Sequence, residues 1–142
     1  MINMPVRKRV RLKDYNYSSN GTYFITICTE NRLPILSTVM KNGNEIVPVL
    51  TAIGKEIEKS INFIGEKYKD VSVDNYVIMP DHIHMLISLK SAGGHGNPPL
   101  QDILGRFKSY TTHMYGKELW QRSYIDHVIR NQEDYTEKWE YI

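Results

Sequence analysis

The segment from residue 71 to residue 90 constrains the fold more than any other part of the sequence. It contains two apolar runs, VSVDNYVIM and HIHMLISLK, which are separated only by Pro80 and Asp81. Valine, isoleucine and tyrosine favour extended backbone, and a proline ends a central strand because it has no amide proton to donate. So short a connection can join antiparallel strands but not parallel ones. The segment therefore predicts two neighbouring antiparallel strands.

Three further elements are expected before this pair. Residues 21–32 are rich in β-branched and aromatic side chains, which predicts a largely buried strand. Residues 35–49 hold the turn signal KNGNE between short apolar pieces, which indicates a small hairpin. Residues 50–68 carry isoleucines at helical spacing between Lys and Glu, and Thr51 can cap that helix.

The remaining elements follow the strand pair. A second helix is expected over residues 100–119, a last strand within 119–129, and a last helix over 131–142 with Asn131 as its cap. The order is strand, helix, strand, strand, helix, strand, helix. This order predicts an α+β fold, a ferredoxin-like sandwich with a split βαβ arrangement. Its antiparallel sheet has helices on one face and an extra C-terminal helix, and the other face is free to hold a functional site.

Length and composition indicate a single domain. The chain has 142 residues, of which 41% are apolar and 24% charged, so residues 1–142 can form one ordinary core. No apolar run is long enough to cross a bilayer, and the N-terminus lacks the apolar region of a secretory signal. The single cysteine, Cys28, cannot form an internal disulfide. We expect a cytoplasmic, nucleoid-associated protein with no membrane partner.

Two histidines stand one residue apart in the strand HIHMLISLK. Side chains at i and i+2 of a strand point to the same face, with Cα atoms about 6.5–7 Å apart. His82 and His84 could therefore close on one metal ion, while Ile83 points into the core. A His-X-His pattern alone is more often structural than metal-binding. Asp81 strengthens the metal reading, because it could ligate the ion or orient an imidazole.

Two ligands do not complete a metal site. A structural zinc site needs four, usually with thiolates, and this chain has one cysteine. Of the remaining histidines, His127 could approach the sheet, whereas His95 lies in a glycine-rich loop and His113 on the second helix. An incomplete ligand set suits a catalytic ion, whose open positions are filled by substrate oxygens.

Positive charge is concentrated near the N-terminus. The net charge is only +2, yet RKRVRLK places five cations between residues 7 and 13. The basic arm over about residues 5–14 is either a solvated tail or a segment that contacts nucleic-acid phosphates. Its candidate phosphate contacts are Arg7, Lys8, Arg9 and Arg11.

Four motifs together resemble one family. They are MPDHIHML, GRFKSYTT, LWQRSYIDHVIRNQEDY and the final EYI. This combination resembles the single-tyrosine HUH transposases, named for histidine–hydrophobic–histidine, and in particular the REP-associated tyrosine transposases. The resemblance runs from about residue 14 to the last residue. It implies a ferredoxin-like catalytic domain and a divalent ion, Mg²⁺ or Mn²⁺, held by His82 and His84.

The resemblance also implies a tyrosine nucleophile on the last helix. Tyr141, in the YI pair after the LW element, is the matching position. Tyr135 matches a tyrosine at the start of this helix that we interpret as structural. Tyr110 is the rival nucleophile, because it lies beside Arg106 and Lys108. In the family, a polar residue one helical turn after the YI pair can provide the third metal ligand, and Asp81 and His127 are the substitutes to test here.

The expected reaction is cleavage and rejoining of single-stranded DNA beside a hairpin. Attack by Tyr141 gives a 5′-phosphotyrosine, and rejoining needs no nucleotide cofactor, which agrees with the lack of a phosphate-binding loop motif. Homodimers are expected, in which the last helix serves its own histidine pair or that of its partner. The expected DNA-binding residues outside the arm are Arg106, Lys108 and Arg122.

Other functions are compatible with the same fold. A domesticated or inactive relative would bind hairpins without recombining them. A ferredoxin-like RNA-binding module would show aromatic residues on its central strands, where this chain shows His82 and His84. A metal enzyme or metal sensor unrelated to DNA would bind metal without any need for Tyr141.

Overall fold

The computed structural model describes residues 21–90 and 99–142. The basic arm, with Arg7, Lys8, Arg9 and Arg11, and the loop histidine His95 lie outside the described residues. No helix in the described ranges is long and apolar enough to span a membrane.

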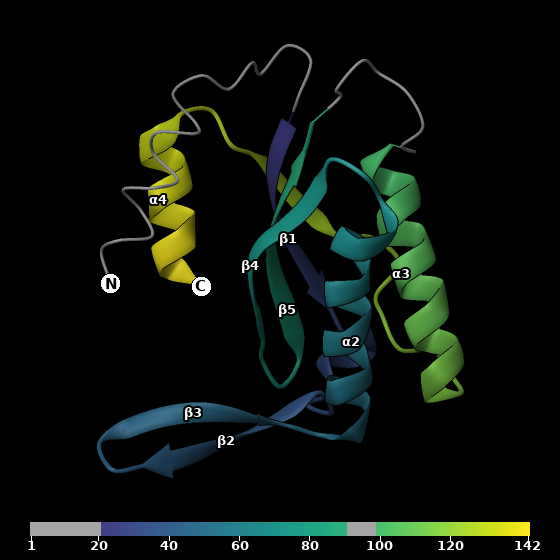
Figure 1. Ribbon diagram of the computed structural model, residues 1–142. Coiled ribbons are helices and arrows are strands. Elements are labelled where there is room, and N and C mark those ends of the chain that lie inside the picture. Colours follow the sequence, from purple (N-terminus) through teal and green to yellow (C-terminus); the bar gives the residue numbers. More distant parts are fainter. Residues whose placement is uncertain (1–20, 91–98) are drawn as a thin grey trace.

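A four-stranded antiparallel sheet forms the centre of the fold (Figure 1). Its spatial order is β4 (Val71–Ile78), β5 (His82–Leu89), β1 (Gly21–Cys28) and β6 (Ile125–Val128). β5 lies between β1 and β4, so the βαβ unit that joins β1 to β4 is split, as the sequence predicts. β4 and β5 are antiparallel neighbours, which confirms the pairing predicted from the Pro80–Asp81 junction.

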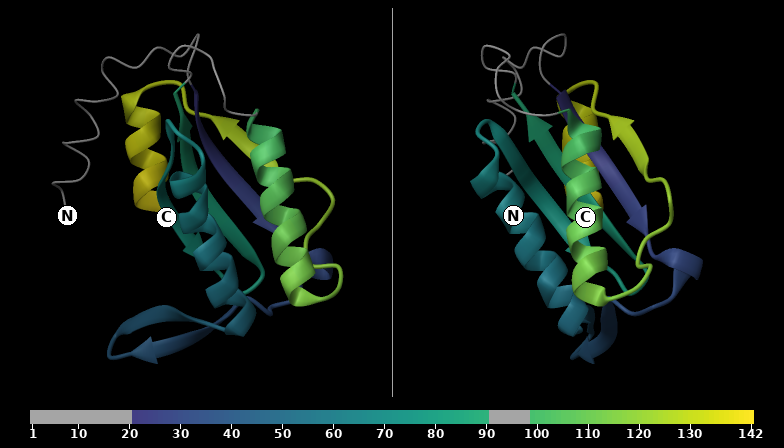
Figure 2. Two further views of the ribbon diagram at one scale, coloured as in Figure 1. Left: turned by 45° about the vertical axis from the view of Figure 1, so that its right-hand side comes forward. Right: turned by 90° about the vertical axis from the view of Figure 1, so that its right-hand side faces the viewer.

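Helices lie on both faces of the sheet. Figure 2 shows α2 (Ala52–Lys67) and α3 (Leu100–Tyr115) side by side on one face, with α4 (Gln132–Tyr141) on the other. The prediction of an extra C-terminal helix is confirmed. The prediction that the second face is free needs correction, because α4 covers part of it through apolar contacts with β1 and β5.

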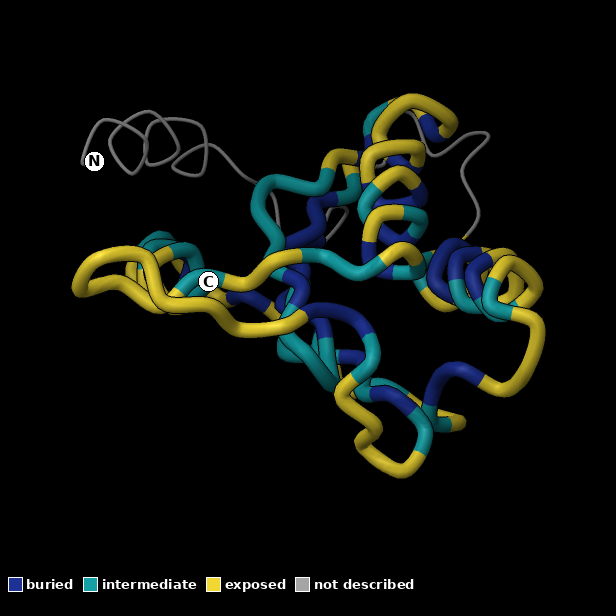
Figure 3. The backbone as a smooth tube through the Cα atoms, turned by 90° about the horizontal axis from the view of Figure 1, so that it is seen from below, coloured by how far each residue is buried: buried dark blue, intermediate teal, exposed yellow. Residues whose placement is uncertain are grey.

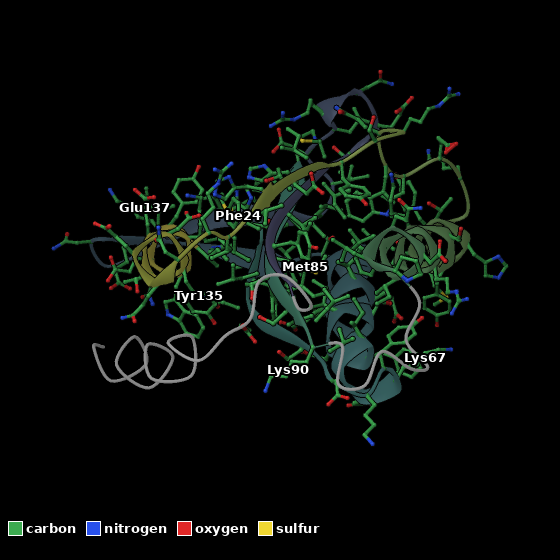
Figure 4. All side chains as sticks on the ribbon, turned by 90° about the horizontal axis from the view of Figure 1, so that it is seen from above. Phe24, Lys67, Met85, Lys90, Tyr135 and Glu137 are labelled. Carbon is green, nitrogen blue, oxygen red and sulfur yellow. The ribbon has the colours of Figure 1, made fainter. Side chains whose placement is uncertain are left out.

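The alternation of side chains along β1 and β5 divides the apolar residues between the two faces. On one face Ile25, Ile83 and Met85 are fully buried against α2 and α3. On the other face Phe24 and Leu86 pack against α4. Figure 4 shows Phe24 on the side toward α4 and Met85 on the side toward α2. Each fully buried aliphatic side chain stabilises the fold by about 1.5–3 kcal/mol. The larger cluster, under α2 and α3, is therefore the main core.

The helix boundaries follow local capping. The Thr51 side chain accepts a hydrogen bond from the Gly54 amide, and the Asn131 side chain accepts one from the Asp134 amide, so both predicted caps are confirmed. α3 ends at Tyr115 rather than at residue 119, because Gly116 takes a left-handed backbone with φ 93°. A glycine adopts that conformation at little cost and closes the helix.

The segment between β1 and α2 forms the predicted hairpin. β2 (Ser37–Asn42) and β3 (Glu45–Leu50) pair antiparallel in a sheet of their own. The hairpin projects from the domain below α4 (Figure 1), and most of its residues are exposed (Figure 3). The strand expected over residues 21–32 ends earlier, at Cys28, and a short 3₁₀ turn (Glu30–Arg32) follows.

Gly54, near the start of α2, lies directly against the backbone of Leu36. A Cβ atom at this position would overlap the carbonyl oxygen of Leu36. We expect Gly54→Ala to lower the free energy of unfolding by about 1–3 kcal/mol, because backbone must move to relieve the overlap. Urea denaturation followed by circular dichroism measures this change.

The matched control is Gly105→Ala within α3, where an added Cβ meets nothing within 4 Å. Here alanine should raise the free energy of unfolding by up to about 1 kcal/mol, the usual difference in helix propensity. Equal effects at both positions would contradict the close packing of α2 on Leu36.

Candidate metal and nucleophile site

The candidate site begins at the first residues of β5. His82 and His84 point to the face that carries α4, and their ring centroids lie 4.8 Å apart. Ile83 between them is fully buried on the opposite face. The two-residue periodicity of the strand thus brings the two imidazoles together, as the sequence predicts.

Each imidazole has a hydrogen-bond partner at Nδ1. His82 Nδ1 lies 2.8 Å from Asp81 Oδ1, and a carboxylate there requires the ring to donate. His84 Nδ1 lies 2.9 Å from the hydroxyl oxygen of Thr26, which can accept the Nδ1 proton. With both Nδ1 atoms protonated, both Nε2 atoms carry a lone pair. Metal-binding histidines are usually held in this way.

Asp81 is itself held by an arginine. Arg32 Nε and Nη2 each lie 3.1 Å from Asp81 Oδ2, while Oδ1 faces His82. The backbone φ of Arg32 is 54° and that of Asn31 is 58°, which is uncommon for residues with a side chain. The amide and hydroxyl of Thr29 both donate to the Asp81 carbonyl, at 3.0 and 3.2 Å. The turn after β1 and the turn before β5 therefore form one hydrogen-bonded unit.

The electrostatics of this unit favour neutral histidine at position 84. Burial, and secondly the neighbouring His82, lower the pKa of His84 to about 4. The hydrogen bond from His82, opposed by burial and helped by Arg32, lowers the pKa of Asp81 below its ordinary value. A neutral imidazole beside an ionised carboxylate is the state that binds a cation.

Tyr141 lies beside the histidine pair. It is on the last turn of α4, its side chain is 69% exposed, and its ring centroid is 5.4 Å from that of His84. Phe24 from β1 stacks on His84 at 5.0 Å and meets Tyr141 edge-on at 6.0 Å. Contacts among three rings from three elements thus bring the exposed Tyr141 to the side of the sheet that carries the imidazoles.

The other two candidate tyrosines have different surroundings. Tyr135 is 1% exposed, and its hydroxyl donates to Asp74 Oδ2 at 2.7 Å. Tyr110 is 53% exposed on α3, where it lines a groove of about 420 Å³ between α2 and α3. Because these helices cover the opposite face, the sheet separates Tyr110 from His82 and His84.

His127 does not join the pair. It pairs with Phe24 across the β1–β6 ladder, whereas His84 and His82 pair with Thr26 and Cys28 from the other side of β1. His127 is therefore two strand spacings of about 4.8 Å from β5, and it is shifted along β1 by about 6.5 Å from His84 and about 13 Å from His82. His127 Nε2 instead lies 2.8 Å from Asp134 Oδ2 at the start of α4. Within residues 21–90 and 99–142, no three His, Cys, Asp or Glu side chains are close enough to hold a metal ion.

The cations expected to bind DNA are spread over other surfaces. Arg106 lines the groove between α2 and α3 and donates to the Tyr68 hydroxyl at 3.3 Å. Lys108 donates to the backbone carbonyls of Gln121 and Arg122 at 2.8 and 2.9 Å, and burial lowers its pKa. The structure thus gives the Lys108 ammonium group a partner within the chain. The Arg122 side chain is exposed.

Sequence reasoning missed Arg32, Thr26 and Phe24. Asp81 follows directly from its position beside His82, but its arginine partner is 49 residues away in the chain. Thr26 and His84 become neighbours only through the β1–β5 register. The alternation of side chains in TYFITIC shows which residues of β1 share a face of the sheet. It does not show which of these residues contacts a histidine.

Comparisons with known proteins show similarity in sequence and in fold. No family model matches the chain. An uncharacterized protein of Haemophilus influenzae is 32% identical over 158 residues, covering 96% of this chain and 86% of the relative. The REP-associated tyrosine transposase of Escherichia coli K12 is 25% identical over 129 residues, covering 89% of this chain and 66% of the relative.

Two solved structures share the fold. A structure of the REP-associated tyrosine transposase bound to a REP hairpin has a TM-score of 0.65 at 23% identity, covering 90% of this chain and 67% of that one. A crystal structure of a candidate transposase from Deinococcus radiodurans R1 has a TM-score of 0.54 at 14% identity, covering 90% of this chain and 91% of that one. The predicted α+β fold with an antiparallel sheet is confirmed.

The Arg32–Asp81–His82 hydrogen bonds give a prediction for metal affinity. Asp81→Asn should weaken Mn²⁺ binding by about 10–100-fold, because asparagine has a single acceptor oxygen and cannot accept from both Arg32 and the protonated Nδ1 of His82. Isothermal titration calorimetry with Mn²⁺ measures this. Asp126→Asn, at an exposed aspartate of β6, is the control and should bind as the wild type does. Equal affinities for the two variants would contradict the orienting role of Asp81.

Proposed function

We propose that this chain, which is similar to the REP-associated tyrosine transposase of Escherichia coli in sequence and to a REP-associated tyrosine transposase in fold, is a member of that family. We propose that it cleaves and rejoins single-stranded DNA beside a hairpin, with Tyr141 as the nucleophile. The observation that carries the proposal is the placement of the exposed Tyr141 ring 5.4 Å from His84, on the histidine face of the sheet. A related protein has been solved in complex with a REP hairpin, which supports a hairpin as the ligand.

The proposed reaction is a phosphoryl transfer to Tyr141. Its hydroxyl oxygen forms a bond to phosphorus while the bond from phosphorus to the 3′ oxygen breaks. The tyrosine hydroxyl loses its proton and the departing oxygen gains one, so the products are a 5′-phosphotyrosine and a free 3′-hydroxyl group. Attack by a 3′-hydroxyl on the phosphotyrosine reverses these changes and rejoins a strand.

His82 and His84 are the residues that would hold the ion. Their donor set fits a divalent cation with open positions, since both Nδ1 atoms have partners and both Nε2 atoms can coordinate. Mg²⁺ or Mn²⁺ bound there would stabilise negative charge on a non-bridging phosphate oxygen. Asp81 and Arg32 keep the His82 ring in place, and Phe24 supports the His84 ring by stacking.

Single-stranded DNA is the form that can reach this site. Tyr141 can reach a phosphate only when the neighbouring bases are out of the way. In a duplex, base pairing and stacking would keep those bases in place. We propose that the basic arm, through Arg7, Lys8, Arg9 and Arg11, and the exposed Arg122 contact phosphates of the hairpin. We also propose that the chain acts as a homodimer, with α4 serving its own site or that of its partner.

A covalent-adduct assay tests the nucleophile. Hairpin oligonucleotides with single-stranded flanks, drawn from palindromes beside the gene, are end-labelled and incubated with protein and Mn²⁺. We expect a protein–DNA band that survives denaturation with the wild type and with Tyr110→Phe, and no band with Tyr141→Phe. Both substitutions remove a hydroxyl group from a side chain that is more than half exposed, so they form a matched pair.

A band lost only in Tyr110→Phe would reassign the nucleophile and keep the reaction class. Hairpin binding with no band in any variant, at any divalent-metal concentration, would refute cleavage and establish a binding-only relative.

Removal of the metal should abolish formation of the covalent adduct without changing the affinity for the hairpin. With excess EDTA we expect no adduct but unchanged hairpin affinity, because most binding energy comes from phosphate contacts. His84→Ala should reproduce the effect of EDTA even when Mn²⁺ is present, and His113→Ala on α3 should not. Adduct formation by His84→Ala at the wild-type rate would exclude the histidine pair as the ion site. Fluorescence anisotropy of a labelled hairpin gives the affinity.

A further inference from the structure

The helix that carries Tyr141 rests on the sheet through few apolar contacts. The buried residues of this contact are Phe24, Leu86, Ile129 and Tyr135. α4 has ten residues, and a helix this short is only marginally stable in water on its own. The position of Tyr141 must therefore depend on whatever fixes α4 to the sheet.

An irregularity in β4 supplies a polar anchor. Val73 pairs with Ile87 and Asn75 pairs with Leu86, so Asp74 is an extra residue inserted into β4 at a register shift relative to β5. Such a bulge changes which side chains face the same way. Because of it, Ser72 and Asn75 both lie on the α4 face, although they are three residues apart.

The Asp74 carboxylate accepts hydrogen bonds from hydroxyl groups of the sheet and of α4. Oδ2 accepts from Tyr135 Oη and from Ser88 Oγ, each at 2.7 Å, and Oδ1 accepts from Ser72 Oγ at 2.7 Å. Ser88 Oγ also lies 3.0 Å from Thr22 Oγ1, which extends the network to β1. Hydrogen bonds from hydroxyl groups to a carboxylate are about twice as strong as those between neutral groups. Asp74 therefore ties one side chain of α4 to three strands.

A second tie lies one helical turn further along α4. Asn75 Nδ2 donates to the carbonyl oxygen of Trp139 at 3.3 Å, and the Trp139 ring stacks on Tyr135 at 6.0 Å. Figure 4 shows Tyr135 on the sheet side of α4 and Glu137 on its far side. The two consecutive residues of the bulge thus hold the helix at Tyr135 and at Trp139, two residues before Tyr141.

We infer that Asp74 is a positioning residue for Tyr141: through Tyr135 it fixes α4 so that the nucleophile lies over the histidine pair. The inference rests on the proposed function of Tyr141. A misplacement of about 1 Å at a reacting group can lower a rate by on the order of 100-fold. Loosening α4 should therefore reduce the rate of adduct formation far more than it changes the binding of DNA or metal.

The test compares Asp74→Asn with the wild type in the full chain. Asparagine keeps the shape of the side chain but loses the charge and one acceptor oxygen. With Mn²⁺ and saturating hairpin, we expect the single-turnover rate of adduct formation to fall by about 10–100-fold. Hairpin affinity and Mn²⁺ affinity should stay at wild-type values. Hydrogen exchange should accelerate in residues 132–141 and stay unchanged in β1 and β5.

Two further variants make the test specific. Tyr135→Phe removes only the hydroxyl group that donates to Asp74. The double variant should be no slower than the slower single variant, because Asp74 acts on α4 through this one of its three hydrogen bonds. Glu137→Gln makes the same change of carboxylate to amide on the outer side of α4 and should leave rate and exchange unchanged.

Two results would overturn the inference. One is an Asp74→Asn variant with the wild-type rate and unchanged exchange in α4. The other is faster exchange throughout the sheet with parallel loss of DNA and metal binding, which would make Asp74 a general stability residue. If the wild type forms no adduct, the proposed function fails, and exchange in residues 132–141 of Asp74→Asn still decides whether Asp74 anchors α4.

Discussion

The strict alternation of side chains along β5 is the constraint on which the rest of the structure depends. Ile83, Met85 and Ile87 are fully buried under α2 and α3, so His82 and His84 must point to the other face. A shift of register by one residue would bury both imidazoles and expose the core. The free energy of core burial therefore also fixes where the histidines point, and no separate interaction is needed to turn them outward.

Around this strand, the two imidazoles contact side chains from three other parts of the chain. Asp81 comes from the turn before β5, Thr26 from β1, and the Tyr141 ring from α4. The sheet also separates two surfaces of different character. The histidines, Tyr141 and Phe24 share one face, whereas Tyr110 and Arg106 line a groove on the other. Substitutions in that groove can change the stability of the fold without contact with the candidate site.

The sequence predicts those features that depend on short-range pattern. The antiparallel β4–β5 pair follows from the Pro80–Asp81 junction, and the two caps follow from Thr51 and Asn131 beside apolar periodicity. The shared direction of His82 and His84 follows from the pleat. Tyr141 was singled out by resemblance to a family, and its place beside His84 needed the tertiary structure.

The features that escaped prediction depend on register and on backbone irregularities. The bulge at Asp74 has no local signal in VSVDNYVI, because it exists only relative to β5. The turn that aims Arg32 at Asp81 requires positive φ at two residues that are not glycine. Lys108, which the sequence suggested for DNA, donates to two carbonyl oxygens of a loop that packs beside α3. Each of these outcomes is decided by partners distant in the chain.

The distance between Tyr135 and Tyr141 along α4 determines how far a tilt of the helix displaces Tyr141. Six residues of helix span about 9 Å, so a tilt of about 10° around Tyr135 would displace the Cα atom of Tyr141 by about 1.5 Å. A small tilt of α4 is thus enlarged at Tyr141, and the Asp74–Tyr135 contact at 2.7 Å and the Asn75–Trp139 contact at 3.3 Å together limit that tilt.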